Sequence, residues 1–191
     1  MSTSPDSEDA QQPLEELTQW LDRYRQLRVG YDTWAHRSFA DLVTAHGLFF
    51  DPAPWLKRGP QRPGQCFAAA SHWSDEKGWA YVEGFAVAPS AVPFAVFEHA
   101  WCLTDEGDVA DPALPDGVVT GYFGIPLNSD FRREQQRLRA AKAVFTSDPS
   151  NPLAGLNEQI LRQGLPRHAL ARDAGARSRE GRRGNEGSAR P

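Results

Sequence analysis

Three side chains in the middle of the chain are of the types that carry out acyl transfer: Cys66, His99 and Asp111. A cysteine thiolate attacks a carbonyl carbon, a histidine moves the proton, and a carboxylate orients the histidine. The second cysteine, Cys102, lies within an apolar run, where a thiol is usually buried and unreactive. The residue types therefore indicate thiol chemistry centred on Cys66.

The segment before Cys66 predicts that this thiol stands at the start of a helix. Residues 51–64 hold four prolines and two glycines, which is typical of a loop. A helix is expected over residues 65–75, with Cys66 in its first turn. The unpaired N–H groups and positive dipole end of a helix favour a thiolate. A buried, inert thiol is the alternative for Cys66.

The other two side chains are expected on a β-hairpin. Residues 94–104 and 108–113 read as strands, joined by the three-residue loop 105–107 with Gly107 in the left-handed conformation. Side chains alternate between the two faces of a strand, so this loop places His99, Trp101 and Asp111 on one face. His99 and Asp111 become diagonal neighbours, about 7–8 Å apart. A four-residue loop would move Asp111 to the opposite face.

The same register sends Glu98, Cys102 and Asp108 to the other face, so it prefers Asp111 as the carboxylate that orients His99. An ordinary hairpin with a core histidine is the alternative. In the catalytic interpretation the backbone N–H of Cys66 would be an oxyanion donor. The candidates for oxyanion or substrate binding are Gln61, Gln65 and Trp101: Gln61 or Gln65 would be a second donor or simply solvated, and Trp101 would shield the ion pair or serve packing.

The motifs Gly64-Gln65-Cys66, His99-Ala100-Trp101 and Asp111-Pro112 resemble those of the transglutaminase-like branch of the papain-like cysteine enzyme superfamily, over about residues 60–127. The resemblance implies an α+β fold in which a helix carrying the cysteine packs on an antiparallel sheet, with flanking helices. It implies a peptidase, amidase, deamidase or transglutaminase-type acyltransferase without a cofactor. The implied substrate is a peptide or protein amide, or a small acyl or amide compound.

The remainder of the chain predicts the flanking elements of one domain over residues 13–166. Helices are expected at 13–28, 33–46, 129–145 and 150–163, and further strands at 79–87 and 118–125. The arginines of the helix at 129–145 are expected on a solvated face. Residues 1–12 and the Arg-rich segment 167–191 are low in apolar residues and are expected to be disordered.

Composition excludes several classes of function. The 191 residues carry a net charge of -4, and the basic segment 167–191 leaves residues 1–166 more acidic still, which argues against nucleic acid as the main ligand. The polar start without an apolar run predicts no secretory signal, no membrane span and a cytoplasmic protein. The sequence contains no closely spaced pair of Cys or His residues that would indicate a metal site. A non-catalytic papain-like binding module within a protein assembly is the alternative to an enzyme.

Overall fold

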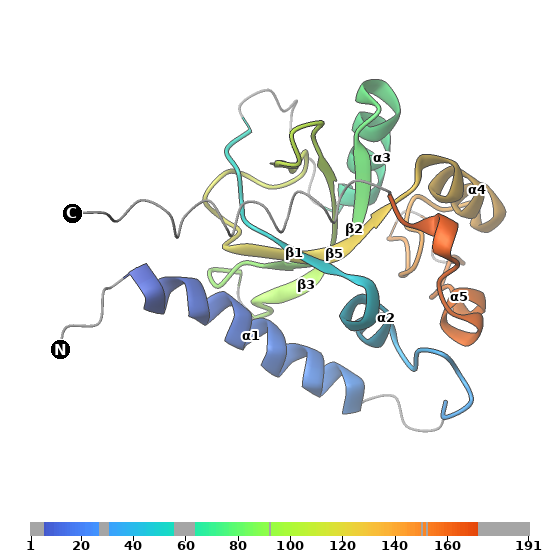
Figure 1. Ribbon diagram of the computed structural model, residues 1–191, viewed down its shortest axis with the longest axis horizontal. Helices are drawn as coiled ribbons and strands as arrows, with labels where there is room; N and C mark the ends of the chain where they lie inside the picture. Colours follow the sequence, from blue (N-terminus) through green and yellow to red (C-terminus); the bar gives the residue numbers. More distant parts are fainter. Residues whose placement is uncertain are drawn as a thin grey trace, which may run out of the picture.

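The computed structural model describes residues 6–26, 31–55, 64–91, 93–149, 151 and 153–171, with the side chains of the first helix described from Glu15 onward apart from Arg25. The fold is α+β, and its five strands form one antiparallel sheet in the order β1-β5-β2-β3-β4 (Figure 1). The helices are α1 (Asp6–Gln26), α2 (Phe39–His46), α3 (Cys66–Lys77), α4 (Ser129–Arg139), α5 (Glu158–Gln163) and a 3₁₀ turn, η1 (Arg167–Ala169). The strands are β1 (Leu48–Phe50), β2 (Ala80–Val87), β3 (Val96–Leu103), β4 (Val109–Ala110) and β5 (Gly121–Leu127).

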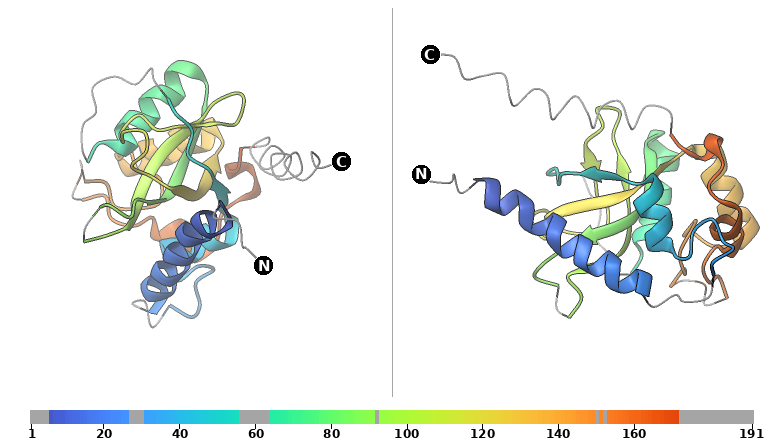
Figure 2. Two further views of the ribbon diagram at one scale, coloured as in Figure 1. Left: turned by 90° about the vertical axis from the view of Figure 1, so that its left-hand side faces the viewer. Right: turned by 60° about the horizontal axis from the view of Figure 1, so that its bottom comes forward.

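Helices cover one face of the sheet, and α1 crosses it as a long diagonal (Figures 1 and 2). The residues of α1, α2 and α3 in this layer pack with those strand side chains that point to the same face. The buried members include Leu17, Leu21, Phe39, Leu42, Phe67, Ala70, Phe85, Ala100, Cys102 and Ile125. This layer is the main core and holds α3 against β2 and β3.

Loops cover the opposite face, which carries His99. A second core lies here, formed by Phe50, Val82, Ala86, Trp101, Leu103, Val109, Val119 and Tyr122. The sheet is therefore buried on both faces, which explains why β2 reads as a nearly continuous apolar run rather than an alternating one.

The hairpin between β3 and β4 has the predicted register. Cys102 pairs with Ala110 and Leu103 with Val109, and the Thr104 N–H donates to the Asp108 carbonyl over 2.9 Å. The loop is thus three residues long, and Gly107 has a φ of 89°, in the left-handed region. By this alternation His99, Trp101 and Asp111 share a face, as expected.

The helix boundaries differ from the prediction in four places, and the last of them is α5, which was expected at 150–163 but begins only at Glu158. The first helix begins at Asp6 rather than at residue 13, so the expected disorder is wrong for residues 6–12. The second begins only at Phe39, because the Ser38 side chain accepts a hydrogen bond from the Asp41 N–H and caps the helix there. It ends before Gly47 as predicted.

The third difference lies at the end of α4, which stops at Arg139 and not at Phe145. Ala140 adopts a left-handed conformation, and the chain then crosses the sheet, where backbone N–H groups bind the buried carboxylate of Glu83. Phe145 is buried as expected but outside the helix. Tertiary hydrogen bonds therefore override the helical pattern of residues 140–145.

The Arg-bearing face of α4 is only partly solvated. Arg132 is fully buried, bonds Asp75 of α3 and lies over the Tyr81 ring, whereas Arg133 is half exposed. The predicted solvated face is wrong for Arg132, because the sequence could not reveal that α4 packs beside α3.

The C-terminal segment joins the fold further than predicted. The predicted tail begins at residue 167, but η1 follows there, Ala169 is buried and Leu170 bridges to Leu127 of β5. The expected disorder is therefore wrong for residues 167–171. Residues 1–5 and 172–191 lie outside the described part of the chain.

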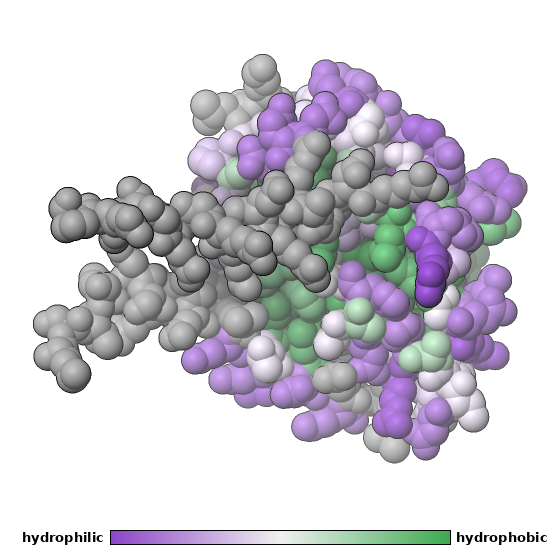
Figure 3. Space-filling view, in the orientation of Figure 1, coloured by the Kyte–Doolittle hydropathy of each residue, from purple (hydrophilic) through white to green (hydrophobic). Residues whose placement is uncertain are grey.

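The surface of the described residues is mixed. In Figure 3, hydrophobic residues reach the surface near the middle of the face, with hydrophilic residues around them. Among the described helices, none is both long and apolar enough to cross a membrane.

Candidate functional site

Cys66 is the first residue of α3. Gly64 has a φ of 77°, a conformation that favours glycine, and Gln65 is the N-cap residue. The first intrahelical bond runs from the Ala69 N–H to the Gln65 carbonyl. The Gln65 side chain accepts no hydrogen bond from the first-turn N–H groups of α3. These donors can therefore bind another acceptor. The thiol of Cys66 is half-buried.

His99 and Asp111 form a buried pair on the loop-covered face. The Nε2 atom of His99 lies 2.8 Å from Oδ2 of Asp111, and the two residues are only 2% and 5% exposed. Because Asp111 engages Nε2, Nδ1 is the ring nitrogen left to face a second partner. The Cys66 side chain lies close enough to the His99 ring to help raise the pKa of the imidazole, so cysteine, histidine and aspartate are neighbours in the fold.

The short length of β4 explains how a helix on one face meets a histidine on the other. β4 pairs with β3 only at Cys102 and Leu103, so beside His99 the edge of β3 has no strand partner among the described residues. Helix α3 packs against β3, and Cys66 at its start lies near enough to the imidazole to influence its pKa.

The electrostatics of the pair favour a charged imidazole. Burial by itself lowers the pKa of His99, but the charge and hydrogen bond of Asp111, with a smaller contribution from Cys66, raise it to about 10. Burial likewise opposes ionisation of Asp111, yet His99 and the donors around the carboxylate hold its pKa below the usual value. The pair is therefore an imidazolium and a carboxylate at neutral pH.

Asp111 is held in place by three more donors. Its Oδ1 accepts the N–H groups of Ala113 and Leu114, and its Oδ2 also accepts the hydroxyl of Tyr122 over 2.8 Å. All four acceptor positions of the carboxylate are thus used. The sequence analysis missed Tyr122, because its strand was predicted but the pairing of that strand was not, so its side-chain direction was unknown.

Trp101 is fully buried and forms one wall of the site. Its ring stacks on His99 with 17° between the planes and also packs on Tyr122. It fits over Gly124, where an added Cβ would lie 2.6 Å from the indole. Complete burial of Trp101 agrees with shielding of the His99–Asp111 pair and with packing. It does not indicate a direct contact with substrate.

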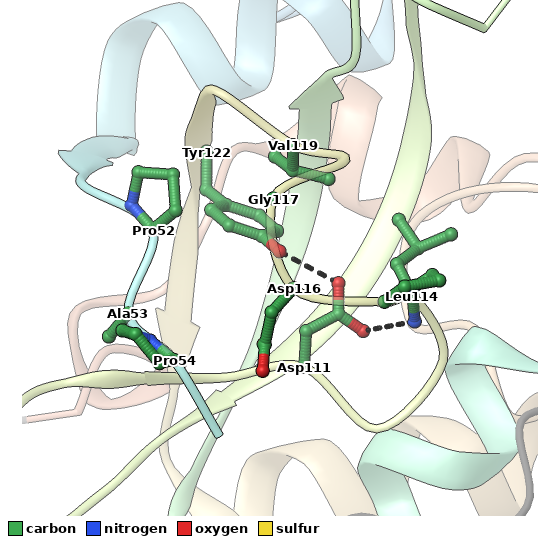
Figure 4. Close-up of a pocket in the computed structure, with 10 residues that line it drawn as sticks. Pro52, Ala53, Pro54, Asp111, Leu114, Asp116, Gly117, Val119 and Tyr122 are labelled. Carbon is green, nitrogen blue, oxygen red and sulfur yellow. Dashed lines mark hydrogen bonds between the residues drawn. The ribbon is translucent and has the colours of Figure 1, made fainter. Parts of the chain in front are cut away.

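A pocket of about 240 Å³ opens on the side of the site away from the helices (Figure 4). Asp111 and Tyr122 are among the residues that line it, and the Tyr122 hydroxyl donates to the Asp111 carboxylate there. The segment Pro52–Pro54 forms one wall, and the loop from Leu114 to Val119 forms the other.

The other residues considered in the sequence lie away from the His99–Asp111 pair or outside the described residues. Gln61 lies outside the described residues, and Gln65 is exposed beside Cys66. Glu98 accepts the Tyr24 hydroxyl on the helix-covered face, as the register required. Cys102 is buried there, donates to the Ala70 carbonyl, and burial raises its pKa to about 12, so it is an inert thiol.

No group of three or more His, Cys, Asp or Glu side chains in the described parts of the chain is arranged to hold a metal ion. The chain was also compared with protein-family models, curated proteins and solved structures, and no match was found in any of the three comparisons. The geometry of the site is consequently the basis for the function proposed below.

Proposed function

We propose that the protein is a cysteine-dependent enzyme that acts on amide or acyl bonds through a thioester on Cys66, with a papain-like, transglutaminase-like core. The observation that carries the proposal is the buried His99–Asp111 hydrogen bond, with the Cys66 side chain near enough to the imidazole to help raise its pKa. Such a chain of nucleophile, base and orienting group is the arrangement that thiol acyl transfer needs.

The first half of the reaction follows from the charges. In the proposed mechanism Cys66 attacks as a thiolate beside the imidazolium of His99, whose charge Asp111 stabilises. The thiolate adds to the carbonyl carbon, and the carbonyl electron pair moves to oxygen. As the intermediate collapses, the C–N or C–O bond breaks and His99 donates its proton to the leaving group.

The second half releases the acyl group. Neutral His99 accepts a proton from water or from an acceptor amine, which attacks the thioester. Collapse of this intermediate breaks the C–S bond and returns the thiolate beside the imidazolium. Hydrolysis and transfer differ only in which nucleophile reaches the thioester.

The start of α3 suits the negative oxygen of both intermediates. The Cys66 N–H belongs to the first turn, whose donors have no intrahelical partner, and the helix dipole is positive there. One such donor accounts for about 3–4 kcal/mol of transition-state stabilisation in thiol and serine acyl transfer.

Alkylation with iodoacetamide tests the thiolate. We expect Cys66 to react at about pH 6, where a free cysteine is almost entirely protonated, and Cys102 to stay unmodified because it is buried. The variant His99→Ala should slow the reaction of Cys66 at that pH at least about tenfold. Peptide mapping by mass spectrometry assigns the label. A rate that His99→Ala leaves unchanged would remove the basis of the proposal.

Trapping separates catalysis from binding. With activated esters and peptide amides, we expect a covalent acyl adduct on Cys66 that is absent in Cys66→Ser and present in Cys102→Ser, the matched control. An alkylation-competent Cys66 that never acylates, with peptides binding non-covalently, would favour the alternative of a binding module instead.

A further inference from the structure

His36 and His46 form a pair of imidazoles remote in sequence from the triad. His36 lies in the segment before α2, and His46 is the last residue of that helix. The two Nε2 atoms are 3.3 Å apart, and the ring centroids are 5.1 Å apart with 77° between the planes. Both rings are half-buried.

A hydrogen bond explains this geometry poorly. The separation of 3.3 Å is longer than the usual N–H donor distance of about 2.7–3.2 Å. A head-on bond of this length between two rings would put the centroids about 5.6 Å apart, since each nitrogen lies about 1.15 Å from its ring centre. The observed 5.1 Å is shorter, so the two ring axes do not face each other head-on.

The two distances fit two ligands on one cation. Bonds of about 2.05 Å at a tetrahedral angle place two imidazole nitrogens about 3.3 Å apart and the ring centroids about 5.2 Å apart. The observed pair of values, 3.3 Å and 5.1 Å, agrees with both.

The protonation state also suits a ligand. Burial lowers the pKa of both histidines, and for His36 the neighbouring His46 lowers it further while Asp41 partly opposes this. Neutral imidazole is the form that binds a metal, so little proton release is needed at neutral pH.

We propose that His36 and His46 bind one divalent transition-metal cation of the kind that prefers imidazole, such as Zn²⁺, through both Nε2 atoms. The described residues offer no third His, Cys, Asp or Glu for it. Water or another small ligand completes the coordination, which makes the site exchangeable.

The cation would join the two ends of the α2 region. The N–H of His36 already donates to the Leu161 carbonyl of α5 over 2.9 Å, and that of Ala35 donates to the Arg162 carbonyl. A bound metal would therefore fasten this α5-linked segment to the end of α2 and raise the thermal stability of the fold.

Calorimetry with Zn²⁺ tests the proposal on the untagged full-length chain. The Cys66→Ser background removes the reactive thiol, which is a competing zinc ligand. We expect one binding site, and at least about tenfold weaker binding in His36→Gln and in His46→Gln, or about 1.4 kcal/mol. The control His72→Gln changes an exposed histidine of α3 and should leave binding unchanged.

Long-range ¹H–¹⁵N spectra of the imidazoles give a readout that misfolding does not imitate. Addition of Zn²⁺ should shift the Nε2 signals of His36 and His46, and circular dichroism should show that each glutamine variant is folded. The proposal is overturned if no binding occurs up to about 1 mM Zn²⁺. It is equally overturned if both glutamine variants bind like the parent, or if only other histidines shift.

Discussion

At the scale of single residues, the protonation of His99 depends on what surrounds the ring. Asp111 bonds its Nε2 atom, Cys66 lies near the ring, and Trp101 covers one of its faces. In water a histidine loses its charge near pH 6.5, whereas here it stays charged to about pH 10. The ion pair thus links the candidate chemistry to the stability of the protein.

The pH dependence of stability follows with a definite sign. The pKa of His99 is raised, so its contribution is fully present below pH 6.5 and is lost as the pH rises through about 10. The pKa of Asp111 is lowered, so its contribution is present above pH 3.8 and is lost as the pH falls through the lowered value. We expect Asp111→Asn to lower the free energy of unfolding by on the order of 3 kcal/mol at neutral pH.

Urea unfolding at a series of pH values measures this effect. The difference between wild type and Asp111→Asn should be largest near pH 6–7 and should shrink toward pH 10 as His99 loses its proton. A difference that stays constant over this range would mean that His99 is neutral throughout.

At the scale of elements, the β3–β4 hairpin sets the register of the site. Gly107 has a φ of 89°, a conformation that costs other residues about 1–2 kcal/mol. We expect Gly107→Ala to destabilise the fold by about that amount in denaturant unfolding. Gly155→Ala is the control, because an added Cβ there meets no atom within 4 Å, and it should stay within about 0.5 kcal/mol of wild type. Equal effects at both positions would argue against the left-handed turn.

The position of α3 depends on its neighbour α4. Arg132 and Arg133 both bond Asp75, but Arg132 is fully buried and also bonds Gln136. We expect Arg132→Ala to cost about 3 kcal/mol of unfolding free energy, since it leaves a cavity and unpaired partners. Arg133→Ala should cost less than about 1 kcal/mol, because that pair is half exposed. Thermal denaturation compares the two, and similar losses would show that the burial of Arg132 has no energetic consequence.

At the scale of the whole molecule, Glu83 connects the sheet to the C-terminal third of the chain. Its side chain is fully buried and accepts the backbone N–H groups of Val144, Phe145 and Thr146, as well as the Tyr81 hydroxyl. Burial raises the pKa of the Glu83 carboxyl, and these donors oppose that rise. These hydrogen bonds hold residues 144–146, which follow α4, against β2 of the sheet.

Replacing this carboxylate should loosen the C-terminal third. In Glu83→Gln, either orientation of the amide sets its NH₂ group against a backbone N–H, so we expect a loss of about 3 kcal/mol. Tyr81→Phe removes one hydroxyl donor and should cost about 1 kcal/mol. Hydrogen exchange should show faster exchange at residues 144–146 in Glu83→Gln. Unchanged exchange there would contradict the anchoring role.

The sequence alone determined the local parts of this protein. The turn chemistry of residues 105–107 and the two-residue period of the strands decided that His99 and Asp111 share a face, and the proline- and glycine-rich loop predicted a helix with Cys66 in its first turn. These features depend on neighbouring residues along the chain, so a single sequence is enough to read them.

Only the tertiary structure decided the contacts between distant segments. It brought Tyr122 to Asp111, buried Arg132 beside α3, ended α4 at Arg139 and paired His36 with His46. Each depends on which strands pair and which helices pack together, and the periodicity of one segment carries no information about its partner. The sequence therefore predicted the local arrangement of His99 and Asp111, and long-range packing added the contacts that surround them.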